Sequence, residues 1–263
     1  MASEAARVVA GVDVGSECVK VVLLDEEKKI RGRAVVPTRG YFEACVEEVL
    51  GLALDEAGCA REGLAAIYAT GFGASCARDA RGRVSSASCH ARGAFHHKAC
   101  AMTIIDLGGR EPRAIRVDSE GQRQDVRGVR KCAVGIGSFL IFAARHLDVH
   151  PTRMQELAAS AKLPAVISSY CSVFSSNELL ERLREGATRE DVALGCMRSI
   201  AERIMEVGDL EDPLVVTGGV PEYFPGVLRE LAEMSKKEVI AAPDPIYTGA
   251  LGAALAALAY RGD

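Results

Sequence analysis

The stretch that decides the fold reads VVAGVDVGSECVKVVLL and covers residues 8–24. Two runs rich in β-branched residues flank a Gly15-Ser16 turn, which predicts a β-hairpin. Asp13 stands at the end of the first strand, where its carboxylate can meet a metal ion bound to phosphate, directly or through water. Gly15 and Ser16 lack bulk and offer backbone N–H groups to phosphate oxygens. An ordinary tight hairpin explains the same residues, so this stretch alone leaves both interpretations open.

The same pattern recurs in the middle of the chain. Residues 102–109 read MTIIDLGG, a second apolar strand that ends in Asp106 and the glycine pair Gly108 and Gly109. Residues 114–121 then read as the outgoing strand and its turn. The repetition of strand, acid, glycine and hairpin indicates an internal duplication, with two related domains that close on one ligand.

A third glycine motif follows an apolar strand nearer the C-terminus. Residues 214–220 read LVVTGGV, and a helical pattern follows Gly218 and Gly219. Paired glycines at a strand-to-helix joint let the backbone approach a nucleotide closely, and the helix start presents N–H groups to it.

The composition excludes several classes of protein. A chain of 263 residues and 27.9 kDa fits one large domain or two smaller ones, and 49% hydrophobic residues supply a full core. A net charge of -4 argues against bulk electrostatic binding to nucleic acid or to an anionic membrane. No apolar run reaches the roughly 18 residues of a membrane span, and no signal peptide precedes the first strand. We therefore expect a cytoplasmic protein.

Nine cysteines are many for such a chain, and two of them stand apart. The number is odd and no pair has C-x-x-C spacing, so a disulfide framework is not expected and most should be small buried side chains. Cys132 lies in KCAVGIGSFL (131–140) and Cys171 lies in SSYCSVF (168–174), each just ahead of a helical pattern. These two cysteines fit ligands of a metal cluster, while free buried cysteines near turns remain the alternative.

In ordered combination, these motifs resemble a known group of ATPases. The Asp13, Asp106 and Thr217 motifs follow the order phosphate, phosphate, adenosine of the sugar kinase, heat-shock ATPase and actin superfamily. Four further segments resemble one branch of it, the BadF/BadG and 2-hydroxyacyl-CoA dehydratase activator family. They are residues 88–93 (SCHARG), 132–137 (CAVGIG), 168–174 (SSYCSVF) and 247–254 (YTGALGAA).

The resemblance covers nearly the whole chain and implies an α/β fold. It implies two related ribonuclease H-like domains of the actin and sugar-kinase type, with the nucleotide in the cleft between them. The first domain would comprise residues 1–99 with the C-terminal helix 246–263, and the second residues 100–245. By resemblance, Asp106 would position Mg²⁺ or the attacking water and Asp13 would support the metal–phosphate geometry. ATP or ADP would contact Gly15, Ser16, Lys20, Gly108, Gly109, Gly218 and Gly219.

The resemblance also implies an electron-transferring ATPase. Such proteins are dimers in which two cysteines of each subunit, matched here by Cys132 and Cys171, share one 4Fe-4S cluster. A cluster usually needs four thiolates, so two per chain agree with completion across a two-fold axis. A ferredoxin or flavodoxin would supply the electron. ATP would drive its transfer to an acyl-CoA dehydratase or reductase partner.

Three residues depart from the family's pattern. Arg110 and Glu111 stand where activators usually carry Gln-Asp, and Ser176 replaces the usual acid after the second cysteine, although Glu178 remains. Arg110 fits either a phosphate ligand or a solvated surface residue. Three alternatives stay open: the ATP-binding subunit of a heteromeric benzoyl-CoA reductase, a small-molecule kinase of the same fold, and a nucleotide-binding regulator that does not hydrolyse ATP.

Overall fold

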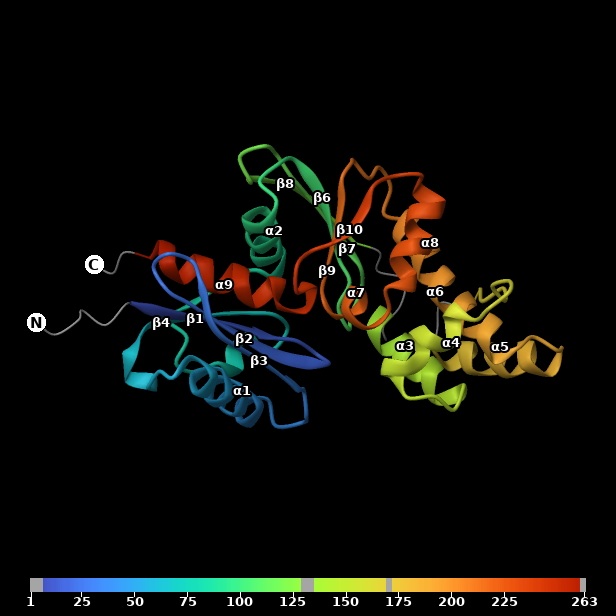
Figure 1. Ribbon diagram of the computed structural model, residues 1–263, viewed down its shortest axis with the longest axis horizontal. Helices are drawn as coiled ribbons and strands as arrows, with labels where there is room; N and C mark the ends of the chain where they lie inside the picture. The colour runs from blue at the N-terminus through green and yellow to red at the C-terminus, as the bar shows by residue number, and fades with distance from the viewer. Residues whose placement is uncertain (1–6, 129–134, 169–171, 261–263) are drawn as a thin grey trace, which may run out of the picture. The chain divides into compact units, whose positions relative to one another are not determined.

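The computed structural model describes residues 7–128, 135–168 and 172–260 (Figure 1). The chain divides into two compact units, Met1–Cys100 with Ile246–Asp263, and Ala101–Pro245. Each unit is built on one five-stranded sheet. No helix of the described residues is long and apolar enough to cross a bilayer.

The first unit contains the predicted hairpin as the centre of a mixed sheet with the order β3-β2-β1-β4-β5. Strand β1 pairs with β2 in antiparallel and with β4 in parallel orientation. The strands are β1 (Val8–Val14), β2 (Cys18–Leu24), β3 (Ile30–Pro37), β4 (Leu64–Thr70) and β5 (Gly82–Arg83). The helices are α1 (Phe42–Ala57), α2 (Ser86–His97) and α9 (Thr248–Ala259), with short 3-10 turns η1 (Arg61–Gly63), η2 (Ala74–Cys76) and η4 (Pro245–Tyr247).

Alternation along β1 explains how this sheet is covered. Val8, Ala10, Val12 and Val14 belong to the hydrophobic cluster that includes α1, whereas Val9 packs in a second cluster with α9. Successive side chains of a strand point to opposite faces, so one strand serves two cores. Helix α1 therefore covers one face and α9 the other, and α2 packs against α9 (Figure 1).

The second unit repeats the same sheet with more helices. Its order is β10-β9-β6-β7-β8, again with an antiparallel meander and one parallel neighbour of the first strand. The strands are β6 (Met102–Asp106), β7 (Arg113–Val117), β8 (Arg123–Gly128), β9 (Leu214–Thr217) and β10 (Val239–Ala241). The helices are α3 (Ile136–His146), η3 (Pro151–Arg153), α4 (Met154–Ala159), α5 (Ser172–Arg184), α6 (Arg189–Met205), α7 (Gly219–Tyr223) and α8 (Gly226–Ser235).

The matching strand orders confirm the predicted α/β fold with two related domains. Strands β1 to β5 correspond in sequence order and in pairing to β6 to β10. The predicted hairpins are each extended by a third antiparallel strand, β3 or β8, which the sequence motifs did not indicate. The units differ in what separates their third and fourth strands. That connection holds α1 in the first unit and helices α3 to α6 in the second.

Candidate functional site

Asp13 lies buried at the end of β1, between two neighbouring strands. In the sheet register it stands opposite Lys20 of β2 and Thr70 of β4. The Lys20 Nζ donates to Asp13 Oδ2 at 3.0 Å, and both side chains are largely buried. The ammonium also lies 3.0 Å from the position that a Cβ at Gly15 would take. Lys20 therefore joins the strand-end acid to the turn that follows it.

The turn after β1 is held by a backbone hydrogen bond within it and by the Thr38 side chain. The Gly15 N–H donates to the carbonyl of Cys18 at 3.0 Å, and the Thr38 hydroxyl donates to the Gly15 carbonyl at 2.9 Å. Ser16 lies half-buried inside this turn. Asp13, Gly15, Ser16 and Lys20 are thus gathered at one end of the first sheet.

In the second unit, the glycines after β6 and β9 form one structure. Asp106 pairs in register with Thr217. The Leu107 N–H donates to the Thr217 carbonyl at 2.9 Å, and the Leu107 carbonyl accepts from the Val220 N–H at 3.0 Å. Gly218 has a φ of 94°, and a Cβ there would lie 2.5 Å from the Leu107 oxygen. Only glycine fits this position, so the two sequence motifs meet because the second lacks a side chain.

The start of helix α3 is bonded to the loop that follows Asp106. The Ile136 N–H donates to the Arg110 carbonyl and the Gly137 N–H to the Gly108 carbonyl, each at 3.1 Å. The Ser138 hydroxyl donates to the Gly109 carbonyl, also at 3.1 Å. The first N–H groups of a helix have no partner inside the helix, and here the loop carbonyls accept from three of them, since the Ser138 N–H also donates to the Gly109 carbonyl at 3.5 Å. Any shift of residues 108–110 must therefore act on α3.

Gly135 makes this close approach possible. It precedes α3 with a φ of 83°, and a Cβ would lie 2.2 Å from the Gly109 carbonyl oxygen. Cys132 and Cys171, the predicted cluster ligands, lie outside the described residues. Helix α3 nevertheless begins four residues after Cys132, and α5 begins directly after Cys171. These two helices pack against each other.

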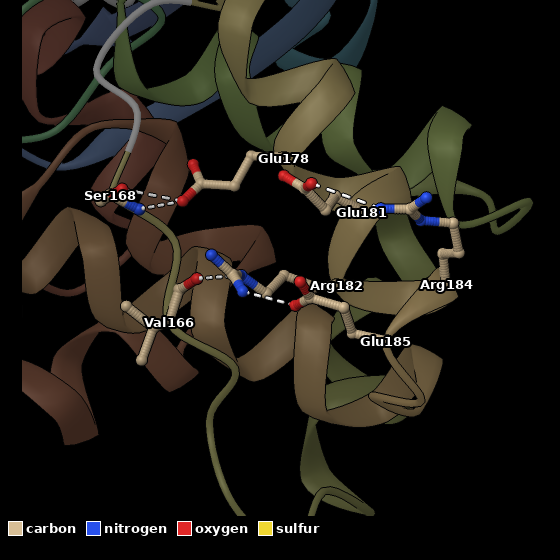
Figure 2. A network of polar contacts seen from close by, with 7 residues as sticks. All are labelled: Val166, Ser168, Glu178, Glu181, Arg182, Arg184 and Glu185. Atoms are coloured by element: carbon tan, nitrogen blue, oxygen red, sulfur yellow. Dashed lines mark hydrogen bonds and ion pairs between the residues drawn. The ribbon is translucent and has the colours of Figure 1, made fainter.

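The segment that leads to Cys171 is fastened to α5 at two points (Figure 2). Glu178 Oε1 accepts from both the Ser168 N–H at 2.9 Å and the Ser168 hydroxyl at 2.8 Å. The Arg182 Nε donates to the Val166 carbonyl at 3.1 Å. Glu178 is only 8% exposed, and burial of a carboxylate without hydrogen bonds costs free energy. The two bonds from Ser168 offset part of that cost.

Several other cysteines are poor ligand candidates. Burial raises the pKa of the Cys196 thiol to about 12 and that of Cys89 to about 11, and it also raises the pKa of Cys18. A metal ligand must be a thiolate, which these surroundings disfavour. In the described ranges, no three His, Cys, Asp or Glu side chains form a metal-binding group.

The departures at Arg110 and Glu111 have visible partners. Arg110 is exposed and its carbonyl receives the Ile136 N–H. Glu111 pairs with Arg113 at 3.5 Å. The side chain of Ser176 is outside the described part of the chain.

No sequence motif indicated that His90 lies close to Asp13. This residue lies on α2 and is 5% exposed. Its Nε2 and the Asp13 Oδ2 each lie 3.1 Å from the point where a Cβ at Gly249 would stand. The signal was present in the SCHARG and YTGALGAA motifs, but only the packing of α2 on α9 joins them.

Known proteins match this chain over nearly its whole length. The profile of the BadF/BadG/BcrA/BcrD ATPase family matches residues 10–257. The chain is 39% identical over 248 residues to the activator of lactoyl-CoA dehydratase from Anaerotignum propionicum, covering 93% of this chain and 95% of the relative. It is 31% identical over 262 residues to one subunit of the benzoyl-CoA reductase from Thauera aromatica, covering 94% and 92%.

Solved structures of similar proteins also match nearly the whole chain. Component A of the (R)-2-hydroxyglutaryl-CoA dehydratase from Acidaminococcus fermentans superposes with a TM-score of 0.90 at 32% identity, over 96% of this chain and 98% of that one. The activator of the 2-hydroxyisocaproyl-CoA dehydratase from Clostridium difficile, with bound ADPNP, gives 0.89 at 32% identity over 96% and 94%. A glucokinase from Streptomyces griseus, at 15% identity over 95% and 98% with a TM-score of 0.59, shares the fold alone.

Proposed function

This chain belongs to the BadF/BadG/BcrA/BcrD ATPase family, and from that premise we propose that it is the ATP-dependent activator of a 2-hydroxyacyl-CoA dehydratase. In this role it accepts one electron from a ferredoxin or flavodoxin. With hydrolysis of ATP it passes that electron to the dehydratase. The protein itself performs no chemistry on the acyl-CoA substrate.

One observation carries this proposal. The N-terminal turn of α3 donates four hydrogen bonds to the loop Gly108–Arg110, and α3 follows the Cys132 segment directly. A loop that contacts the phosphates of ATP would move when the terminal phosphate leaves. The bonds to α3 supply a mechanical route from that event to Cys132. A kinase that only transfers phosphate has no need for such a route.

The nucleotide residues have distinct roles in this proposal. Asp106 positions Mg²⁺ or the attacking water, and Asp13 orients the metal–phosphate group with Lys20 beside it. The backbones of Gly15, Ser16, Gly108 and Gly109 line the phosphates. Gly218, which adjoins Leu107, and the following Gly219 accept the adenosine.

The surroundings of Cys132 and Cys171 fit a 4Fe-4S cluster by the chemistry of their donors. In sequence, Cys132 precedes the start of α3 by four residues and Cys171 directly precedes α5, and the two helices pack together. The positive end of a helix dipole would favour a thiolate beside it. When bound, a 4Fe-4S cluster supplies a one-electron carrier. Two cysteines from a second copy of the chain, or from a related subunit, complete the ligand set. Glu178 and Arg182 hold the approach to Cys171 in place.

The same proposal retains the predicted boundaries, residues 1–99 with 246–263 and residues 100–245, and a cytoplasmic location. The second candidate function is the ATP-binding subunit of a heteromeric benzoyl-CoA reductase. It is favoured by the 31% identity to the benzoyl-CoA reductase relative from Thauera aromatica. Copurification with fixed partner subunits would select it over a separable activator.

Anaerobic purification tests the proposal. We expect about four irons and four acid-labile sulfides per dimer, together with MgATP hydrolysis. Cys132→Ala and Cys171→Ala should each lose the iron, whereas Cys59→Ala, a change at a half-buried cysteine beside α1, should keep it. An iron-free protein whose ATPase requires a small-molecule phosphate acceptor would instead indicate a kinase. ATP binding without hydrolysis would indicate a regulator.

A further inference from the structure

We infer that His90 is a positioning residue that holds the Asp13 carboxylate in place for the metal–phosphate group of ATP. The inference rests on the proposed function and adds to it a residue from α2. It starts from a buried side chain that the nucleotide motifs do not include. His90 is 5% exposed and lies in the first unit, with Asp13 and Gly249.

Helices α2 and α9 are in close contact at two glycines, Gly93 and Gly252. A Cβ at Gly93 would lie 2.3 Å from the Thr248 carbonyl oxygen, and one at Gly252 would lie 1.8 Å from that of Cys89. These contacts bring the two helices closer than side chains would allow. The SCHARG and YTGALGAA motifs are therefore two sides of one helix contact.

The contact between α2 and α9 brings His90 close to Asp13 at the end of β1. At Gly249 the missing Cβ would stand 3.1 Å from both His90 Nε2 and Asp13 Oδ2. The two atoms are thus no further apart than two hydrogen-bond lengths, close enough for a direct bond or one bridging water. Lys20 Nζ already donates to the same Oδ2 at 3.0 Å.

The negative charge of Asp13 also acts on Cys89 of α2. Burial is the main cause of the raised pKa of the Cys89 thiol, and the negative charge of Asp13 adds to it. The Thr70 hydroxyl beside Asp13 has no hydrogen-bond partner of normal geometry among the described residues, although it lies near enough to Cys89 Sγ to lower that pKa. Asp13 therefore faces buried polar groups of β4 and α2.

A buried carboxylate that serves a hydrated metal ion must keep one orientation. Lys20 restrains Asp13 from β2, and His90 approaches from α2. Two restraints from different elements fix a carboxylate better than one, as groups behind a metal ligand commonly do. His90 acts through Asp13 and need not touch the nucleotide.

Side-chain variants that keep or lose the Nε2 position test this role. The amide nitrogen of Gln occupies about the place of His Nε2, whereas Asn reaches only to that of Nδ1. We expect His90→Asn and His90→Leu to lower kcat for MgATP hydrolysis about 10- to 100-fold, the usual effect of losing a group behind a metal ligand, and to raise the Mg²⁺ concentration for half-maximal activity. His90→Gln should stay within a few-fold of the unchanged protein. Binding of ADP without metal, measured by calorimetry, should be the same in all.

Glycine variants supply the matched control. Gly249→Ala places a methyl group between the two side chains and should reproduce the His90→Asn defect in Mg²⁺ dependence. Gly51→Ala also changes a helical glycine, but its methyl group meets no atom within 4 Å, so it should have no effect.

Two results would overturn the inference. One is unchanged Mg²⁺ dependence in His90→Asn and His90→Leu; the other is an equal loss in all three His90 variants, which would mean that the ring matters only for packing. Failure of the unchanged protein to hydrolyse MgATP would count against the proposed function instead. In that case, the inference falls with the activity it serves.

Discussion

Asp13 and Asp106 occupy the same place in two copies of one sheet, yet their neighbours differ. Asp13 stands opposite Lys20 and Thr70, and Asp106 stands opposite Arg113 and Thr217. In the first copy the cation pairs with the acid at 3.0 Å. In the second copy, Arg113 pairs with Glu111 at 3.5 Å. Asp106 is half-buried, whereas Asp13 is buried.

This difference indicates a division of labour after duplication. The first copy fixes its acid with an ion pair, which suits a carboxylate that orients a metal–phosphate group. The second copy keeps its acid more accessible, and its following loop is bonded to α3. The four helices α3 to α6 stand where the first copy has α1 and the short turn η1. The predicted electron-carrying residues therefore lie in what the second copy added.

The largest expected effect lies at the more accessible acid. Asp106→Asn should lower the kcat of MgATP hydrolysis by about 100-fold or more, because it removes the group proposed to position the metal or the water. Asp125→Asn, at a half-buried carboxylate of β8 that pairs with Arg127, is the control and should change kcat little. A steady-state ATPase assay decides. Full activity in Asp106→Asn would remove Asp106 from the mechanism.

The next effect contrasts the two cations directly. Lys20→Met leaves the Asp13 carboxylate buried without its partner and should cost about 3 kcal/mol of unfolding free energy. Arg113→Met breaks a pair whose side chains are 31% and 26% exposed and should cost less than about 1 kcal/mol. Urea unfolding of both variants measures the difference. Equal losses would contradict the distinction between a fixed and an accessible acid.

A smaller effect concerns the tether on α5. Glu178→Ala leaves the Ser168 N–H and hydroxyl without their acceptor and should cost about 1–3 kcal/mol. Glu181→Ala, an exposed residue of the same helix with an ion pair to Arg184, should cost about 0.5 kcal/mol or less. Iron content should fall only in the Glu178 variant. Full iron retention with normal stability there would show that this segment needs no tether.

The smallest effect lies at the junction of loop and helix. Ser138→Ala removes one hydroxyl bond to the Gly109 carbonyl and should cost about 1 kcal/mol. It should also weaken the dependence of electron transfer on ATP hydrolysis, so that more ATP is consumed for each electron delivered. The ratio of phosphate released to electrons transferred measures this coupling. An unchanged ratio would mean that the backbone bonds of Ile136, Gly137 and Ser138 suffice.

The sequence predicted the ends of the central strands well, because an acid and glycines after an apolar run are visible locally. The C-terminal helix predicted within residues 246–263 is α9, which covers Thr248–Ala259. Strand β8 did not, since RQDVRG contains one apolar residue and only its pairing with β7 defines it.

The same limit applies to the site. Nothing near Asp13 in the sequence marks His90, which reaches the acid only because α2 packs on a helix from the other end of the chain. The Lys20 contact could not be predicted from the turn alone, since a two-residue turn at Gly15-Ser16 would place Asp13 opposite Cys18, whereas the strands pair Asp13 with Lys20. Roles assigned to Cys132 and Cys171 rest on the family pattern and stay predictions.

Amide hydrogen exchange at the start of α3 tests most directly whether the nucleotide loop governs the cysteine segment. The Ile136 and Gly137 N–H groups donate to the Arg110 and Gly108 carbonyls, so their exchange reports on the junction itself. We predict that their exchange rates differ between the MgADP complex and the complex with a non-hydrolysable ATP analogue, while those of Val49 and Leu50 in α1 do not. Identical rates at Ile136 and Gly137 with both nucleotides bound would contradict the account.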